Sequence, residues 1–238
     1  MKNVKMFGLV FKGLHLNDLI TLSGGLKFIV TVNAEFIVEA YRDEKFKTII
    51  NENISSFDGQ VPYILARILK KEKFDKISGS DIIYEVLKDN RLNKKKIFLL
   101  GDLPETNKLA VERARTDFGA KCYGYAPEFA PYPFCDEINN NILHELSLVN
   151  PEYLFVAFGA KKQEFWIDEN KEVLEQLGVK FVIGCGGSIS FLANKFNRAP
   201  KAIQKLGLES IYRIIQEPKW FRIKRLFKSF KFLLYTFK

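Results

Sequence analysis

The fold of this chain is decided by residues 95–126, which read KKIFLLGDLPETNKLAVERARTDFGAKCYGYA. The apolar run at 95–102 predicts a buried strand, and the segment after it has the spacing of an amphipathic helix that ends at Gly119. A second strand is expected at 121–126. A strand, a helix and a further strand in this order are typical of a parallel sheet covered by helices.

The same alternation extends outward on both sides of this stretch. Further strands are predicted at 27–33, 152–160 and 179–187, with helical segments between them. The sequence therefore predicts an α/β fold with a doubly wound, mostly parallel sheet flanked by helices. Such sheets bind ligands outside the carboxyl ends of their strands. The residues expected there are Asn33, Gly101–Asp102, Gly159–Ala160 and Gly184–Gly187.

Charge is distributed unevenly along the 238 residues. The net charge is +9, but residues 201–238 alone carry +8, so the preceding part is close to neutral. Pro200 suits the start of a helix, and beyond it two or three helices are expected, separated near Gly207 and Pro218. We therefore predict a core at 1–197 and a helical, basic appendage at 198–238.

The end of the chain alternates cations with large apolar side chains. This composition is typical of a helix that lies on a membrane, so residues 219–238 are expected to contact an anionic membrane surface. A solvated basic face is the alternative, but it leaves many phenylalanines exposed to water. Nucleic acid is not expected as a partner, because the core is near neutral and has no nucleic-acid motif. With no apolar run of 18 residues and no signal peptide, the expected location is cytoplasmic, peripheral on the inner face of the cell membrane.

Three loops contain residues that could take part in chemistry. Asp58 precedes Gly59 between a helical stretch and a second helix that begins near Pro62, where an aspartate often only caps a helix. The segment around Ser80 can cradle a phosphate or cap a helix, and the glycines of 184–188 can approach a phosphate or form a tight turn. The three cysteines are widely spaced, which argues against a zinc site or a disulfide framework.

Taken in order, the blocks TVNAEFIVEA, FDGQVP, SGSD, FGAKKQEFWI and GCGGSISFLANKFNRAPKAIQKLGLESIYRIIQEPKWFRIKR resemble the WecG/TagA/CpsF glycosyltransferase family. The resemblance extends from about residue 7 to 225. It implies a Rossmann-like core, an appendage that reaches the membrane, and an inverting transfer of N-acetylmannosamine or a related hexose. The implied donor is a UDP-sugar, the implied acceptor is an undecaprenyl-diphosphate-linked sugar, and the product belongs to a cell-surface polysaccharide or a teichoic-acid-type polymer.

The resemblance also assigns roles to individual residues. Asp58 matches the expected general base, and Lys76 is a candidate for the donor diphosphate. The other residues expected to bind substrate are Thr31, Asn33, Glu35, Ser80, Gln163, Gly186, Gly187, Arg198, Arg213 and Arg222. No Asp-x-Asp pair is present, so a metal-independent reaction without a cofactor is expected, with cations on the departing diphosphate.

Two positions depart from the family pattern. Ser190 stands where many members have an aspartate, and Lys161 stands where they have a proline. The first departure leaves the donor sugar open. A second interpretation of the whole chain is a non-catalytic nucleotide-binding module at the membrane surface.

Overall fold

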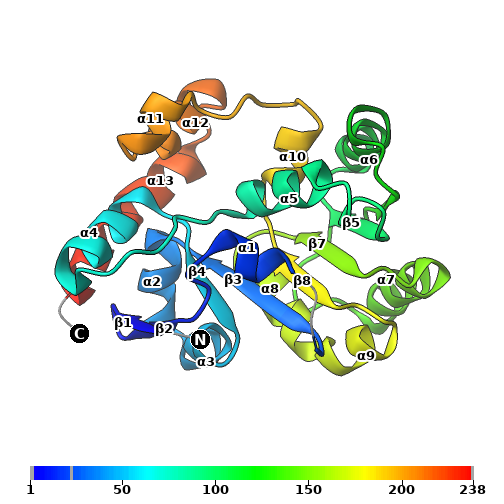
Figure 1. Ribbon diagram of the computed structural model, residues 1–238, viewed down its shortest axis with the longest axis horizontal. Coiled ribbons are helices and arrows are strands. Elements are labelled where there is room, and N and C mark those ends of the chain that lie inside the picture. Colours follow the sequence, from blue (N-terminus) through cyan, green and yellow to red (C-terminus); the bar gives the residue numbers. More distant parts are fainter. Residues whose placement is uncertain (1–2, 22–23, 237–238) are drawn as a thin grey trace. The chain divides into compact units, whose positions relative to one another are not determined.

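The computed structural model describes residues 3–21 and 24–236 (Figure 1). Within these residues, six strands form one parallel sheet in the order β4-β3-β8-β7-β5-β6. The strands are β3 (Lys27–Val32), β4 (Ile54–Phe57), β5 (Ile97–Gly101), β6 (Cys122–Tyr125), β7 (Tyr153–Ala157) and β8 (Phe181–Gly184). The α/β fold with a parallel sheet flanked by helices is therefore confirmed.

The chain divides into two compact units. The first comprises Met1–Asp18, Val30–Ser78 and Phe196–Lys238, and the second comprises Leu19–Ile29 and Gly79–Lys195. Strand β3 contributes residues to both. The C-terminal segment thus groups with N-terminal parts of the chain, while its identity as a separate basic appendage from residue 198 stays a prediction.

The second unit is built around β5, β6, β7 and β8. Figure 1 shows α5 (Gly79–Lys88), α6 (Pro104–Phe118) and α10 (Ser188–Leu192) on one side of these strands, and α7 (Asp136–Val149), α8 (Lys162–Glu169) and α9 (Lys171–Gln176) on the other. All five residues of β5 are buried, as expected for a strand that is covered on both faces. Burial on both faces explains why β5, β7 and β8 appear in the sequence as continuous apolar runs.

A polar contact fixes α6 against the end of β5. The Asn107 side-chain amide donates to the backbone oxygens of Leu99, at 2.9 Å, and Gly101, at 2.8 Å. This approach requires a glycine on β6, because a Cβ at Gly124 would lie 2.2 Å from Asn107 Oδ1. Gly124 therefore serves close packing at this position.

The first unit contains a small antiparallel hairpin and β4. The hairpin strands are β1 (Val4–Met6) and β2 (Leu9–Phe11), and the helices α2 (Ala34–Ala40), α3 (Glu44–Glu52) and α4 (Gln60–Lys70) follow in sequence. The residues of α1 (Leu16–Ile20) are divided between the two units. Phe57 of β4 stacks on Phe11 with ring centroids 3.7 Å apart. The expectation that a helical stretch leads directly into Asp58 was wrong: β4 intervenes. The strand reads ISSF, and its two serines interrupt the apolar run that marks a buried strand, so its pairing decides its conformation.

The chain ends in helices, as predicted. They are α11 (Lys201–Lys205), α12 (Glu209–Gln216), α13 (Trp220–Ser229) and the short 3₁₀ helix η1 (Phe230–Tyr235). Gly207, with φ of +75°, separates the first two, and Pro218 precedes α13. Tyr235 stacks on Tyr41 at 3.8 Å between ring centroids, which attaches the end of the chain to the region after α2. No helix in the described part of the chain is both long and apolar enough to cross a membrane.

Candidate active site

In the first unit, Asp58 lies at the carboxyl end of β4, beside the end of β3. Its backbone N–H donates to the Val32 carbonyl oxygen at 3.0 Å, and its side chain is half-buried. Because Asn33 directly follows Val32, Asn33 and Asp58 follow the ends of two neighbouring strands. This edge of a parallel sheet is where ligands bind.

Asn33 has a structural role at this edge. Its Oδ1 accepts a hydrogen bond from the Phe36 N–H at 3.1 Å, so its side chain caps the N-terminus of α2. Glu35 lies in the first turn of α2, where the helix dipole favours a carboxylate, and Thr31 is buried within β3. Thr31, Asn33 and Glu35 therefore all lie where β3 ends and α2 begins.

Lys76 lies beside the end of β4, although it comes later in the sequence. It forms a parallel bridge with Phe57, and the Ile77 N–H donates to the Phe57 carbonyl oxygen at 2.7 Å. Phe57 immediately precedes Asp58, so the pairing brings the backbone of the Lys76 segment beside the strand that leads into Asp58. A candidate proton acceptor and a candidate partner for an anionic leaving group therefore share one strand end.

In the second unit, Gln163 and Glu164 hold the glycine turn after β8. The Gly186 N–H donates to Gln163 Oε1 at 3.2 Å, and Gln163 Nε2 donates to Glu164 Oε1 at 2.7 Å. A Cβ at Gly184 would lie 2.4 Å from Glu164 Oε1, so the strand end needs a glycine to admit this pair. Gln163 is 3% exposed, and these bonds make it a support of the turn in this structure.

Glu164 is a buried carboxyl that sequence reasoning did not assign to the site. Its Oε2 accepts from the Lys161 N–H at 2.8 Å, at the start of α8. Burial raises the pKa of Glu164 to about 7, although the hydrogen bonds from Gln163 and Lys161 act in the opposite direction. The KQE segment marked the position, but a single sequence does not show that this glutamate is enclosed.

Ser80, Gly186 and Gly187 lie in the same unit as this pair. The hydroxyls of Ser80 and Ser188 are 3.0 Å apart, and the Ser188 hydroxyl also donates to the Cys185 carbonyl oxygen at 2.7 Å. Ser80 therefore ties α5 to the start of α10. Gly186 adopts a φ of +49°, which favours glycine, and Gly187 precedes α10.

Ser190 meets a carboxylate that comes from elsewhere in the sequence. Its hydroxyl donates to Asp102 Oδ2 at 2.6 Å, and Asp102 Oδ1 accepts from the Leu103 N–H at 2.8 Å. Asp102 ends the β5 segment with a φ of +63°, directly after Gly101 at +96°. A carboxylate is thus present beside Ser190 even though position 190 itself lacks one.

We expect Ser190→Ala to lower the free energy of unfolding by about 2 kcal/mol, because it removes a hydrogen bond to a half-buried carboxylate. Urea denaturation monitored by circular dichroism measures the change. Ser147→Ala, which removes a hydroxyl from the side of α7, is the matched control and should cost less than about 0.5 kcal/mol. If the free energy of unfolding falls by the same amount in both variants, the hydrogen bond from Ser190 to Asp102 adds nothing to stability.

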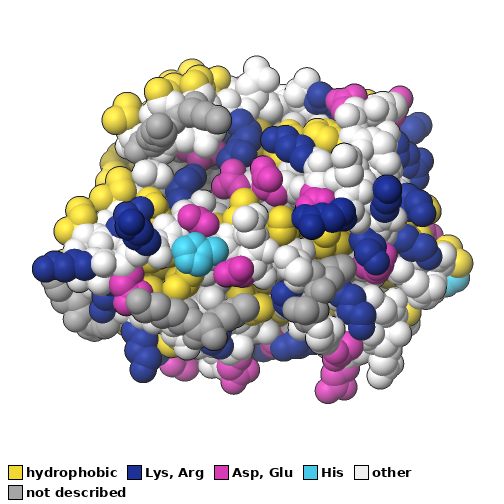
Figure 2. All heavy atoms as spheres, viewed as in Figure 1, with side chains coloured by type: hydrophobic (Ala, Val, Ile, Leu, Met, Phe, Trp, Pro, Cys, Tyr) yellow, Lys and Arg dark blue, Asp and Glu magenta, His cyan; other side chains and the backbone are white. Residues whose placement is uncertain are grey.

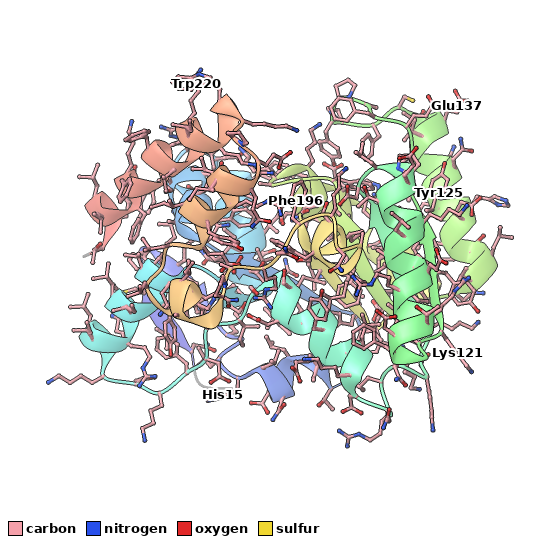
Figure 3. The ribbon with its side chains drawn as sticks, turned by 90° about the horizontal axis from the view of Figure 1, so that it is seen from above. His15, Lys121, Tyr125, Glu137, Phe196 and Trp220 are labelled. Carbon is pink, nitrogen blue, oxygen red and sulfur yellow. The ribbon has the colours of Figure 1, made fainter. Side chains whose placement is uncertain are left out.

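Two of the three predicted arginines contact one carboxylate in the C-terminal helices. Glu217 accepts hydrogen bonds from Arg222 and Lys219, and Arg213 lies 3.9 Å away. Burial alone would raise the pKa of Glu217, but the hydrogen bonds and charges of Lys219 and Arg222 outweigh it and hold the pKa below its usual value. The Arg213 guanidinium also lies 3.7 Å from the ring centre of Phe196, a residue that Figure 3 labels. Arg198 is half-buried in the segment before α11.

The predicted site residues therefore form two sets. The first unit contains Asp58 with Thr31, Asn33, Glu35, Lys76 and the three arginines, and the second contains Ser80, Gln163, Gly186 and Gly187. The first set supplies carboxylates and cations, and the second supplies a glycine turn that the Gln163 side chain holds in place. Among the described residues, no group of three or more His, Cys, Asp or Glu side chains could hold a metal ion.

Comparison with known proteins agrees with the sequence resemblance. The profile of the "Glycosyl transferase WecG/TagA/CpsF family" matches residues 4–238. The chain is similar to the N-acetylglucosaminyldiphosphoundecaprenol N-acetyl-beta-D-mannosaminyltransferase of Staphylococcus aureus strain MRSA252, with 30% identity over 209 residues, 87% of this chain and 78% of the relative. The protein of the same name from strain MW2 is 30% identical over 213 residues, with the same coverage of both chains. On this evidence the chain belongs to the WecG/TagA/CpsF family of glycosyltransferases.

Proposed function

We propose that this protein is an inverting transferase that moves N-acetylmannosamine or a related hexose from a UDP-sugar to an undecaprenyl-diphosphate-linked sugar. The product would enter a cell-surface polysaccharide or a teichoic-acid-type polymer. The names of the similar proteins support the lipid-linked acceptor and the class of sugar. The structural observation that carries the proposal is the position of Asp58 between the ends of β3 and the Lys76 segment.

In the proposed mechanism, Asp58 takes the proton from a hydroxyl of the acceptor sugar. The freed oxygen attacks the anomeric carbon of the donor from the face opposite the UDP. The bond from that carbon to the diphosphate oxygen breaks, and its electron pair leaves with the UDP. Lys76 neutralises part of the developing charge, so that no metal ion is required in this scheme.

The glycine turn after β8 is proposed to receive the nucleotide part of the donor. Gly186 and Gly187 leave the backbone uncovered by side chains, and the buried Gln163–Glu164 pair fixes the turn. A turn that is held in place before binding loses little conformational freedom when the ligand arrives. Gln163 therefore acts as a positioning residue in this proposal.

Residues 219–238 are proposed to hold the enzyme on the inner surface of the cell membrane. The side chain of Trp220 is 67% exposed and Figure 3 shows it pointing away from α13. Large apolar side chains further along are also exposed, namely Phe227, Phe230, Leu233 and Leu234. Exposed aromatic groups among cations are typical of helices that lie in the headgroup region. No nucleic-acid partner is included in this proposal.

The test is UDP release from a panel of UDP-sugars, with polyprenyl-diphosphate-linked N-acetylglucosamine as acceptor and with EDTA present. Release that needs the acceptor and occurs with one donor is the expected result. Release abolished by EDTA would contradict the metal-independent scheme. If UDP binds but no donor is consumed with this or another lipid-linked acceptor, the alternative of a non-catalytic nucleotide-binding module is favoured.

A further inference from the structure

Helix α4 presents an unusual apolar surface to solvent. Val61, Ile64, Ile68 and Leu69 are between 40% and 65% exposed, whereas Pro62 and Ala66 are buried. The first three recur at intervals of three and four residues, so they lie on one side of the helix. A monomer that stayed in water would gain nothing by exposing this stripe.

Cations border the stripe on α4. Arg67, Lys70 and Lys71 are exposed, and residues 60–71 contain no acidic side chain. A helix with an apolar stripe and a basic border has the composition of an interfacial membrane helix. A second copy of the chain is a poorer occupant, because it would bring an identical set of positive charges to the same surface.

The stripe continues onto the C-terminal helices within the same unit. A Cβ built at Gly207 would lie 3.4 Å from Gln60 Cβ and Val61 Cγ2, so the turn between α11 and α12 lies against the start of α4. Leu206 and Leu208, on either side of Gly207, are exposed. Figure 2 shows hydrophobic side chains along the left and upper-left margin, where Figure 1 places α4 and α11–α13.

We infer that α4 is a second lipid-contacting element, which inserts Ile64 and Ile68 at the headgroup boundary of an anionic membrane while Arg67 and Lys70 bind lipid phosphates. The inference deepens the proposed membrane-surface function and rests on it. It also gives lipid contact a direct structural link to the site, because α4 begins two residues after Asp58. A membrane that holds α4 therefore also restrains the segment that carries the proposed base.

Vesicle flotation of the full-length protein tests this inference. Vesicles of phosphatidylglycerol and phosphatidylcholine are compared with vesicles of phosphatidylcholine alone. Ile64→Gln combined with Ile68→Gln is expected to lower the partition coefficient on the anionic vesicles about tenfold, because these two side chains no longer gain free energy by moving from water into lipid. Arg67→Gln combined with Lys70→Gln should lower binding to the anionic vesicles only.

The matched control is Leu109→Gln combined with Leu148→Gln. These leucines are 50% and 66% exposed, but they lie on α6 and α7 of the second unit, so binding should stay at the wild-type level. Glutamine suits an exposed helix position, and thermal melting verifies that each variant is folded.

Unchanged binding of the α4 variant would overturn the inference. If the α4 variant binds vesicles normally and light scattering shows that it is a monomer where the wild type is a dimer, the stripe is an interface between two copies of the chain. Vesicle flotation measures membrane binding and does not require the enzyme to turn over a substrate. Failure of the transferase proposal, seen as absent UDP release by the wild type, is therefore distinguished from failure of this one.

Discussion

Asp58→Asn is expected to lower kcat on the order of 10³-fold and to leave the KM for the donor within a few-fold of the wild type. Asparagine has nearly the same shape as aspartate and keeps the backbone hydrogen bond to Val32. It cannot accept the proton of the acceptor hydroxyl at neutral pH. The loss therefore falls on the chemical step rather than on binding.

Steady-state UDP release with a saturating lipid-linked acceptor measures both constants. Glu52→Gln is the matched control, because Glu52 is an exposed carboxylate at the end of α3 in the same unit. It should retain the wild-type kcat. A kcat for Asp58→Asn within threefold of the wild type would exclude Asp58 as the general base, and a raised donor KM alone would make it a binding residue.

Glu164→Gln is expected to remove a large pH dependence from the stability of the fold. Glu164 has a pKa of about 7 in the folded chain, against 4.5 as its ordinary value, because burial disfavours the charged carboxylate. A raised pKa means that the folded state holds the proton more tightly than the unfolded state. The protonated Glu164 therefore contributes to the free energy of unfolding. This contribution is complete below about pH 4.5 and is lost as the pH rises through 7. The loss is on the order of 3 kcal/mol.

Urea denaturation from pH 4.5 to 8 measures this effect as the difference between the two proteins. The wild type should become less stable relative to Glu164→Gln across this interval. The substitution also replaces one hydrogen-bond acceptor, but that cost is the same at each pH, so only the change in the difference is tested. Parallel stability curves would show that Glu164 does not titrate with a raised pKa.

Local signals in the sequence were sufficient for most of the sheet. The runs at 95–102 and 179–187 are apolar because their strands are covered on both sides, and this burial leaves a continuous signal. Gly119 ends α6 in the left-handed conformation, as its position after an amphipathic segment predicted. Strands β1 and β2 have only three residues, and β4 reads ISSF, so none of them carries a comparable apolar run and they were not predicted.

The site was predictable only where a motif lies close together in sequence. Asp58 and Gln163 were selected because their neighbours matched the family's pattern, whereas Glu164 was not assigned to the site. Contacts across long sequence separations gave no signal: Asp102 and Ser190, for example, are 88 residues apart. The apolar stripe of α4 was also missed, because the spacing of Ile64 and Ile68 indicates an apolar side of a helix without saying whether it faces a core.

The sequence by itself determined the kind of elements, their order and the basic end of the chain, because periodicity, glycine positions and net charge are local properties. Only the tertiary structure decided which groups are enclosed and which partners they have. Glu164 is buried against the Gly184 strand end, whereas the stripe on α4 stays in solvent. The physical reason is that burial and hydrogen bonding depend on residues that the fold brings together from distant parts of the chain. The raised pKa of Glu164 is a consequence of that enclosure.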